Sequence, residues 1–262
     1  LPTSSEKVLR ALKEKEGHPF RRLVMFGWRA RIGYINPGVY LHSQEWDRIL
    51  PQGVVWAMFT LGVRSLVREE FERAFNLYIS AGETLASREV DFIICAGMSV
   101  HMAIGHDKSL EMAKRIQEIT GIPTMLQSTA ITNAFNKLSV KKLVMVSPFA
   151  EENNEAHKRY FEDEGFNVLA IKSLGIRDNN DLTKQPLYAS YKLAYEAFHA
   201  APEAEAIYIA CSAWPVLPNI DIIEKDFGKP VITDMTASAW MPLTALNIKT
   251  PVKGYGRLME MI

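Results

Sequence analysis

The chain has 262 residues, of which 48% are hydrophobic and 23% are charged, and this is the composition of an ordinary globular protein. Thirty basic residues balance thirty acidic ones, so no net charge draws the chain to nucleic acid or to an anionic membrane surface. Two widely separated cysteines exclude a disulfide framework and a CxxC zinc site, and no apolar run reaches the roughly 18 residues of a membrane span. Because the N-terminus also lacks a charged-then-apolar signal pattern, we expect a cytoplasmic protein.

The first 86 residues combine an N-terminal arm with the start of a core. Residues 1–28 predict an added arm with a short helix, and such an arm hints at a homo-oligomer. Residues 31–35 predict a buried strand, which the sequence N-P-G at 36–38 ends with a turn. Residues 54–60 predict a second buried strand, and residues 68–86 predict an amphipathic helix.

The remainder of the chain alternates strands with helices. We expect strands at 89–95, 122–126, 142–146, 166–171, 205–210 and 230–233, and helices at 109–120, 128–138, 151–164, 187–200, 220–227 and 236–246. A polar connection is expected at 174–181. The alternation predicts an α/β protein whose parallel sheets carry helices on both faces.

The two halves of the chain repeat one pattern. The segment R-I-G-Y-I-N-P at 31–37 matches K-L-V-M-V-S-P at 142–148, D-F-I-I-C-A-G at 91–97 matches E-A-I-Y-I-A-C at 205–211, and G-I-P at 121–123 matches G-K-P at 228–230. Three matches in the same order predict two pseudo-symmetric three-layer α/β/α halves with mainly parallel sheets and an active site in the cleft between them. We place the first half at 29–138, with the C-terminal segment 230–262 packing back on it, and the second half at 139–229.

These segments resemble the aspartate/glutamate racemase superfamily, whose members work without cofactors at a cleft between two pseudo-symmetric α/β domains. The resemblance covers residues 31–246 and is strongest to the branch that contains maleate cis-trans isomerase and arylmalonate decarboxylase. It implies one catalytic position on each half, and these positions fall on Gly97 and Cys211. A single cysteine with a glycine opposite is the arylmalonate decarboxylase pattern.

The chemistry of a single thiol agrees with this implication. Moving a proton between the two faces of a carbon needs an acid on one side and a base on the other. Loss of a carboxylate as CO2 needs only a stabilised enediolate and one proton donor, and a cysteine with its usual pKa of about 8.5 is mostly a thiol near neutral pH. We therefore predict a cofactor-independent decarboxylase of a small malonate-type carboxylic acid, with Cys211 as the proton donor.

Groups that bind the substrate are expected at the strand ends. The enediolate would accept hydrogen bonds from the backbone N–H groups of Met98, Ser99 and Ser212 and from the Ser99 hydroxyl, and Asn36, Gly97 and Ser147 would complete the site. The resemblance implies a tyrosine where this chain has Phe149 and a hydroxyl residue where it has Met98. Both differences make the cleft more apolar, which favours expulsion of a carboxylate as CO2.

Two alternatives to the decarboxylase stay open. The first is a maleate isomerase or an amino-acid or hydantoin-type racemase in which Cys95, or a residue not identified from the sequence, supplies the missing acid or base. For Cys95 itself, a buried core thiol is the interpretation that we favour. The second is a carboxylate-binding protein without turnover. The sequence contains no glycine-rich nucleotide motif and no cluster of metal ligands, so we expect neither a cofactor nor a metal.

Overall fold

The computed structural model describes residues 26–38 and 43–262. Its elements are β1 (Ala30–Asn36), α2 (Ser43–Asp47), β2 (Val54–Thr60), α3 (Arg68–Phe75), α4 (Tyr78–Ala86), β3 (Phe92–Cys95), α5 (Met98–Ile104), α6 (His106–Thr120), β4 (Thr124–Leu126), α7 (Gln127–Lys137), β5 (Lys142–Phe149), α8 (Glu151–Asp163), β6 (Asn167–Ile176), α9 (Asn179–Leu182), α10 (Tyr188–Ala200), β7 (Ala206–Ile209), η2 (Leu217–Asn219), α11 (Ile220–Phe227), β8 (Val231–Thr233), α12 (Asp234–Ala245) and α13 (Arg257–Glu260). The helix expected in the N-terminal arm lies outside the described residues. Among the described residues, no helix is long and apolar enough to cross a membrane.

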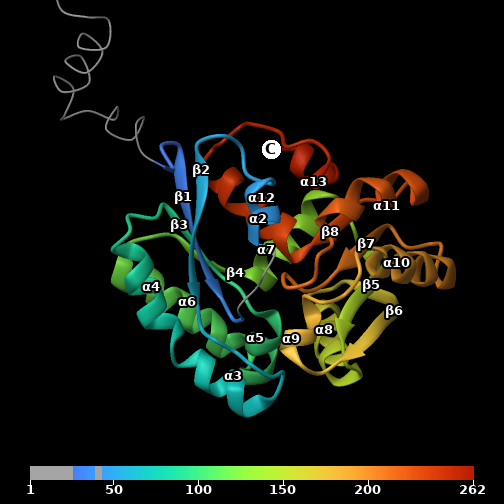
Figure 1. Cartoon of the computed structure of the whole chain (residues 1–262), viewed down its shortest axis with the longest axis horizontal. Helices are drawn as coiled ribbons and strands as arrows, with labels where there is room; N and C mark the ends of the chain where they lie inside the picture. The colour runs from blue at the N-terminus through green and yellow to red at the C-terminus, as the bar shows by residue number, and fades with distance from the viewer. Residues whose placement is uncertain (1–25, 39–42) are drawn as a thin grey trace, which may run out of the picture.

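Two four-stranded parallel sheets form the framework, one in each half of the chain. The first sheet has the order β2-β1-β3-β4 and the second has the order β6-β5-β7-β8, so the two halves share one topology. Figure 1 shows the sheets on the two sides of the molecule, with helices packed around each. The predicted α/β fold of two pseudo-symmetric halves is therefore confirmed, and the paired segments of the sequence repeat occupy equivalent strands.

The central strands of both sheets are buried, as their apolar runs predict. β3 and β7 are buried at every position, and the runs F-I-I-C and A-I-Y-I carry little polar surface. Because parallel strands are covered by helices on both faces, such continuous apolar runs suit them better than an alternating pattern. The carboxyl ends of these two strands lead directly into Gly97 and Cys211.

The C-terminal segment joins the two halves. β8 pairs in parallel with β7, so the second sheet extends beyond residue 229, where the sequence analysis ended the second half. The helix α12 follows β8 at once and packs against α7, which follows β4 in the equivalent position of the first half. Figure 1 shows α7 and α12 near the centre of the molecule, between the two sheets.

Several helical segments differ from the sequence prediction, and the short helices α2, η2 and α13 were not predicted. The helix expected at 68–86 is interrupted at Asn76 and Leu77, where the N–H of Leu77 turns back to the carbonyl of Ala74. For α5 the sequence indicated a helix start at the turn but no bounds, because its N-cap is Gly97 in a left-handed conformation rather than one of the usual side-chain caps. The polar connection expected at 174–181 contains the end of β6 and the start of α9.

Candidate active site between the two halves

The strands β3 and β7 both end in a left-handed turn. Gly97 has φ 102° and Cys211 has φ 85°, at equivalent positions of the repeat. Glycine adopts positive φ freely, whereas another residue in a sparsely populated conformation costs on the order of 1–3 kcal/mol. Strained backbone conformations are often found at functional sites, so the conformation of Cys211 is a first indication that its thiol has a function.

A single pocket brings these two turns together. Its empty space is about 470 Å³ including the open mouth, which suits a small molecule. It is lined by Pro37, Val63, Leu66, Phe71, Gly97, Met98, Ser99, Val100, Gln127, Phe149, His157, Asn179, Leu182, Cys211, Ser212 and Asp234. Six of the eight residues that we singled out from the sequence therefore lie in one cavity: Gly97, Met98, Ser99, Phe149, Cys211 and Ser212.

The other two expected residues, Asn36 and Ser147, do not line the pocket. Asn36 donates a hydrogen bond to the carbonyl of Gly38 at 2.6 Å, and Ser147 bonds to Asn154 and accepts from the N–H of Phe149 at 3.2 Å. Both side chains are buried and shape the turns that follow β1 and β5. Neither side chain therefore faces a ligand in the pocket, because Asn36 bonds within its own turn and Ser147 bonds to Asn154 on α8.

Cys211 is held as a buried thiol. Its side chain lines the pocket, yet the residue is only 6% exposed. Burial raises the pKa of the Cys211 thiol, and the negative charge of Asp234 raises it further, while the backbone N–H groups of Ala213 and Trp214 act in the opposite direction. The pKa stays well above its usual range, so the protonated form dominates at neutral pH.

Asp234 is the principal site residue that the sequence analysis missed. Its carboxylate accepts a hydrogen bond from the Cys211 N–H at 3.1 Å and a second from Tyr208. Burial raises the pKa of Asp234 from 3.8 to about 6, and Tyr208 and the backbone N–H groups of Cys211 and Ser212 limit the rise. The carboxylate is therefore mostly charged at neutral pH. The Ser212 N–H, which we expected to bind substrate, thus also acts on the Asp234 carboxylate.

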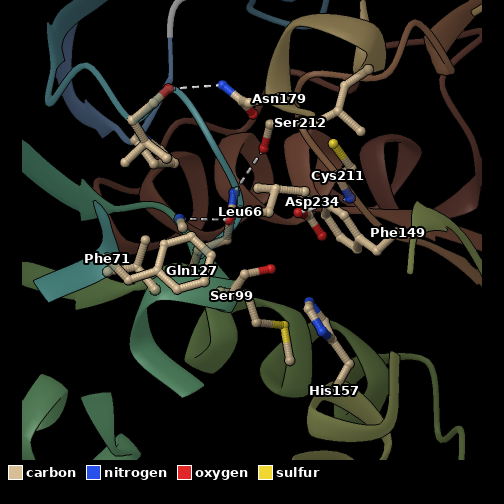
Figure 2. Close-up of a pocket in the computed structure, with 16 residues that line it drawn as sticks. Leu66, Phe71, Ser99, Gln127, Phe149, His157, Asn179, Cys211, Ser212 and Asp234 are labelled. Atoms are coloured by element: carbon tan, nitrogen blue, oxygen red, sulfur yellow. Dashed lines mark hydrogen bonds between the residues drawn. The ribbon is translucent and has the colours of Figure 1, made fainter. Parts of the chain in front are cut away.

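Gln127 cross-links the two halves beneath the pocket. Its amide nitrogen donates to the Tyr34 hydroxyl at 2.9 Å, and the Ser212 and Ser238 hydroxyls lie at 3.1 Å and 3.0 Å. Its carbonyl oxygen accepts from the N–H of Gly97 at 3.2 Å. Figure 2 shows Gln127 and Ser212 meeting on this side of the pocket. The amide thus fixes the turns at Gly97 and Ser212 relative to one another.

The second cysteine lies outside the pocket. Cys95 is the last residue of β3, is fully buried in the apolar core and is absent from the lining. Burial raises the pKa of its thiol as it does at Cys211, so the two cysteines differ in access to the pocket and not in the direction of their pKa shift. Since the whole sequence has two cysteines, Cys211 is the one thiol that this pocket presents.

The space at Gly97 is closed to a side chain. A β-carbon added to Gly97 would lie 2.9 Å from the hydroxyl oxygen of Tyr78 and 3.1 Å from Cγ of Pro37. The Tyr78 hydroxyl is fixed there by a short hydrogen bond that it donates to the carbonyl of Ala96. The backbone conformation and these two contacts together explain why glycine stands where the second half has cysteine.

The described part of the chain contains no cluster of side chains suited to bind a metal ion. No group of three or more histidine, cysteine, aspartate or glutamate side chains lies close enough there to hold a metal ion.

Two duplicated α/β halves with a pocket at their junction are the fold that this chain shares with solved structures of arylmalonate decarboxylase and maleate isomerase. The sequence profile described as arylmalonate decarboxylase matches residues 43–259, and the chain belongs to this family.

The relatives are enzymes of two kinds. The chain is 23% identical over 201 residues to arylmalonate decarboxylase of Bordetella bronchiseptica, covering 76% of this chain and 84% of the relative. It is 26% identical over 185 residues to maleate isomerase of Pseudomonas putida, covering 67% and 72%. The fold matches the liganded structure of an arylmalonate decarboxylase mutant at a TM-score of 0.82. The sequence identity is 22%, and the match covers 87% of this chain and 98% of that chain. In the mutant, a glycine is changed to cysteine and a cysteine is changed to serine.

Proposed function

We propose that the protein is a cofactor-independent decarboxylase of a small malonate-type acid, with Cys211 as its proton donor. The observation that carries this proposal is that one thiol lines the pocket, from the second half, while the equivalent position of the first half is a glycine with no room for a side chain. Before mutation, the fold relative described above carries a glycine and a cysteine at the two positions that were changed in its mutant.

The reaction needs one acid and no base. The bond between the α-carbon and one carboxylate breaks, CO2 leaves, and the electron pair remains on the α-carbon as an enediolate. The Cys211 thiol then gives its proton to that carbon, and the resulting thiolate takes a proton from water. The sum is a malonate plus one proton giving a monocarboxylate and CO2.

The electrostatics of the pocket support the role of Cys211 as an acid. Burial and the adjacent Asp234 raise the pKa of the thiol, so the proton is present when the enediolate forms. The same environment disfavours the thiolate that would have to abstract a proton or add to a double bond. The charge on Asp234 also repels a substrate carboxylate, and this repulsion is relieved when the carboxylate leaves as neutral CO2.

The retained carboxylate is expected to bind at the start of α5. The first N–H groups of a helix have no acceptor within the helix, and Met98 and Ser99 occupy the first two positions of α5 on the pocket wall. The Ser99 hydroxyl adds a side-chain donor there. Apolar side chains form much of the remaining wall, at Val63, Leu66, Phe71, Val100, Phe149 and Leu182, and leave few groups to solvate the carboxylate that is lost.

The similarity to maleate isomerase favours a second candidate function, isomerisation or racemisation. That function needs either a base on the opposite face of the carbon or a nucleophilic thiolate. Cys95 is outside the pocket and position 97 has no side chain, so neither supplies the opposite base. We therefore rank isomerisation and racemisation below decarboxylation.

The test is a reaction in D2O with phenylmalonate and alkylmalonates. A decarboxylase releases CO2 and leaves one deuteron on the α-carbon, and delivery from one thiol gives one enantiomer when the α-carbon becomes chiral. Cys211→Ala should abolish CO2 release, whereas Cys95→Ala should retain it. Interconversion of maleate and fumarate, or deuterium exchange into a monocarboxylate without CO2 release, would contradict the proposal. Binding that is equal in wild type and Cys211→Ala without any turnover would instead identify a carboxylate-binding protein.

A further inference from the structure

His157 is a pocket residue that the decarboxylation chemistry does not use. It projects from α8, lines the pocket and is only 1% exposed. Its ring stacks on Phe149 with centroids 5.5 Å apart and an angle of 28° between the planes. Figure 2 shows the ring extending from its helix toward the side of the pocket where Phe149 and Asp234 lie.

The hydrogen bonding of His157 defines its tautomer. Nδ1 lies 2.7 Å from the backbone carbonyl of Asn153, one helical turn earlier. A carbonyl oxygen only accepts, so Nδ1 carries the proton. Burial lowers the pKa of His157 to about 4, and the ring is neutral near pH 7. Nε2 is therefore an acceptor with a free lone pair.

Nε2 has no hydrogen-bond partner among the described residues. Nε2 is not among the side-chain atoms that are shut off from solvent without a partner, so it opens onto the pocket although the rest of the ring is buried. A free acceptor that opens onto a pocket from a buried ring points to a donor on the ligand. Two other polar side chains of the pocket have partners already: Asn179 donates to the carbonyl of Val63 at 2.9 Å, and Asp234 accepts hydrogen bonds from Tyr208 and the Cys211 N–H. His157 Nε2 and the Ser99 hydroxyl are thus the groups left to bond to a ligand, and of these only the hydroxyl can also donate.

We propose that His157 sets substrate specificity by accepting, at Nε2, a hydrogen bond from a neutral O–H or N–H donor on the α-substituent of the acid. This inference rests on the proposed function and narrows it: the substrate is a malonate whose side chain is mainly apolar, to suit Phe149 and the aliphatic wall, but carries one donor. A site built to bind a substrate hydroxyl rejects the analogue without it, because the buried acceptor is then left unpaired.

The experiment compares phenylmalonate with its 2-, 3- and 4-hydroxyphenyl and methoxyphenyl counterparts, in wild type, His157→Phe and His157→Gln. In wild type, one hydroxyphenylmalonate should have the highest kcat/KM. His157→Phe should lower kcat/KM for that substrate about 10- to 100-fold and leave phenylmalonate within about threefold. His157→Gln, which keeps an acceptor at similar reach, should restore part of the loss. The methoxy compounds should not respond to the variants.

His199 provides the matched control. Its Nδ1 also bonds to a carbonyl one turn earlier, that of Tyr195 at 2.8 Å, and its ring also stacks on an aromatic side chain, but it lies on the exposed face of α10. His199→Phe should change none of the substrate preferences. A loss that is equal for all substrates in His157→Phe would mean that the ring only supports Phe149, and would overturn the inference.

Calorimetry separates this inference from the proposed function. Phenylacetate and the hydroxyphenylacetates need no turnover to bind, so a hydroxyl preference that disappears in His157→Phe supports the role of His157 even if no malonate loses CO2. Decarboxylation without a hydroxyl preference would leave the proposed function standing and overturn the inference. Loss of α-carbon deuterium exchange in His157→Phe, without a change of preference, would make His157 a base and overturn it as well.

Discussion

The strained backbone at Cys211 predicts that two inactive variants of this residue differ in stability. Changing Cys211 to either alanine or glycine removes the thiol, so both variants should be inactive. Alanine retains the β-carbon that is strained at φ 85°, whereas glycine does not. At ordinary positions glycine is less stable than alanine by about 0.5–1 kcal/mol.

The strain reverses this order at Cys211. A left-handed conformation costs an L-residue about 1–2 kcal/mol, which exceeds the usual penalty for glycine. Cys211→Gly should therefore be more stable than Cys211→Ala by about 0.5–1 kcal/mol, or about 1–4 °C in Tm for a chain of this size. Urea denaturation followed by circular dichroism measures the difference, with CO2 release assayed in parallel.

Cys95 is the matched control for this measurement. It is also a buried cysteine at the end of the equivalent strand, but it is not among the residues with positive φ. Cys95→Gly should be less stable than Cys95→Ala by about 0.5–1 kcal/mol, the ordinary difference between glycine and alanine. If glycine is the less stable substitution by the same margin at both positions, the backbone of Cys211 carries no strain and the reasoning is refuted.

Two further predictions concern Gly97 and Asp234. Gly97→Ala should destabilise the fold by about 1–3 kcal/mol more than Gly105→Ala, as measured by urea denaturation. The two glycines have similar φ, but only the β-carbon added at Gly97 meets Tyr78 and Pro37. Equal losses of stability in the two variants would show that the space at Gly97 can open. The raised pKa of Asp234 makes its protonated form stabilising below about pH 4, and this contribution, about 3 kcal/mol, is lost as pH rises through 6. Asp234→Asn should therefore gain stability relative to wild type between pH 4 and pH 7, and a constant difference across that range would contradict the shift.

The sequence predicted the framework of this protein well because its strands are apolar and its repeat is regular. The run at 54–60 matches β2, and the turns after β3 and β7 carry the residues expected there. The sequence signals for helix ends failed where a helix lacks one of the common capping residues. Gly97 precedes a helix without supplying a capping side chain, and so the bounds of α5 could not be predicted.

The missed site residues have different explanations. Asp234 follows β8 as Cys211 follows β7, so the rule that ligands bind at strand ends could have identified it. It was missed because it is the first residue of α12, where an acidic residue is ordinary. His157 lies inside α8, away from any strand end, and its place in the pocket follows only from how α8 packs against α5. Gln127 likewise acquires its partners from strands and helices that are distant in the sequence.

The Gln127 hydrogen bonds bear on how molecules enter and leave. Opening the protein like a hinge would separate the Gln127 amide from the Ser212 and Ser238 hydroxyls, all buried and each costly to leave unpaired. On the other side, the loop after β2 meets the second half through an isolated bridge between Ser65 and Asp178 and one hydrogen bond from Asn179. The loop after β2, whose Val63 and Leu66 line the pocket, is thus tied to the second half by fewer buried hydrogen bonds than those that Gln127 makes between the halves.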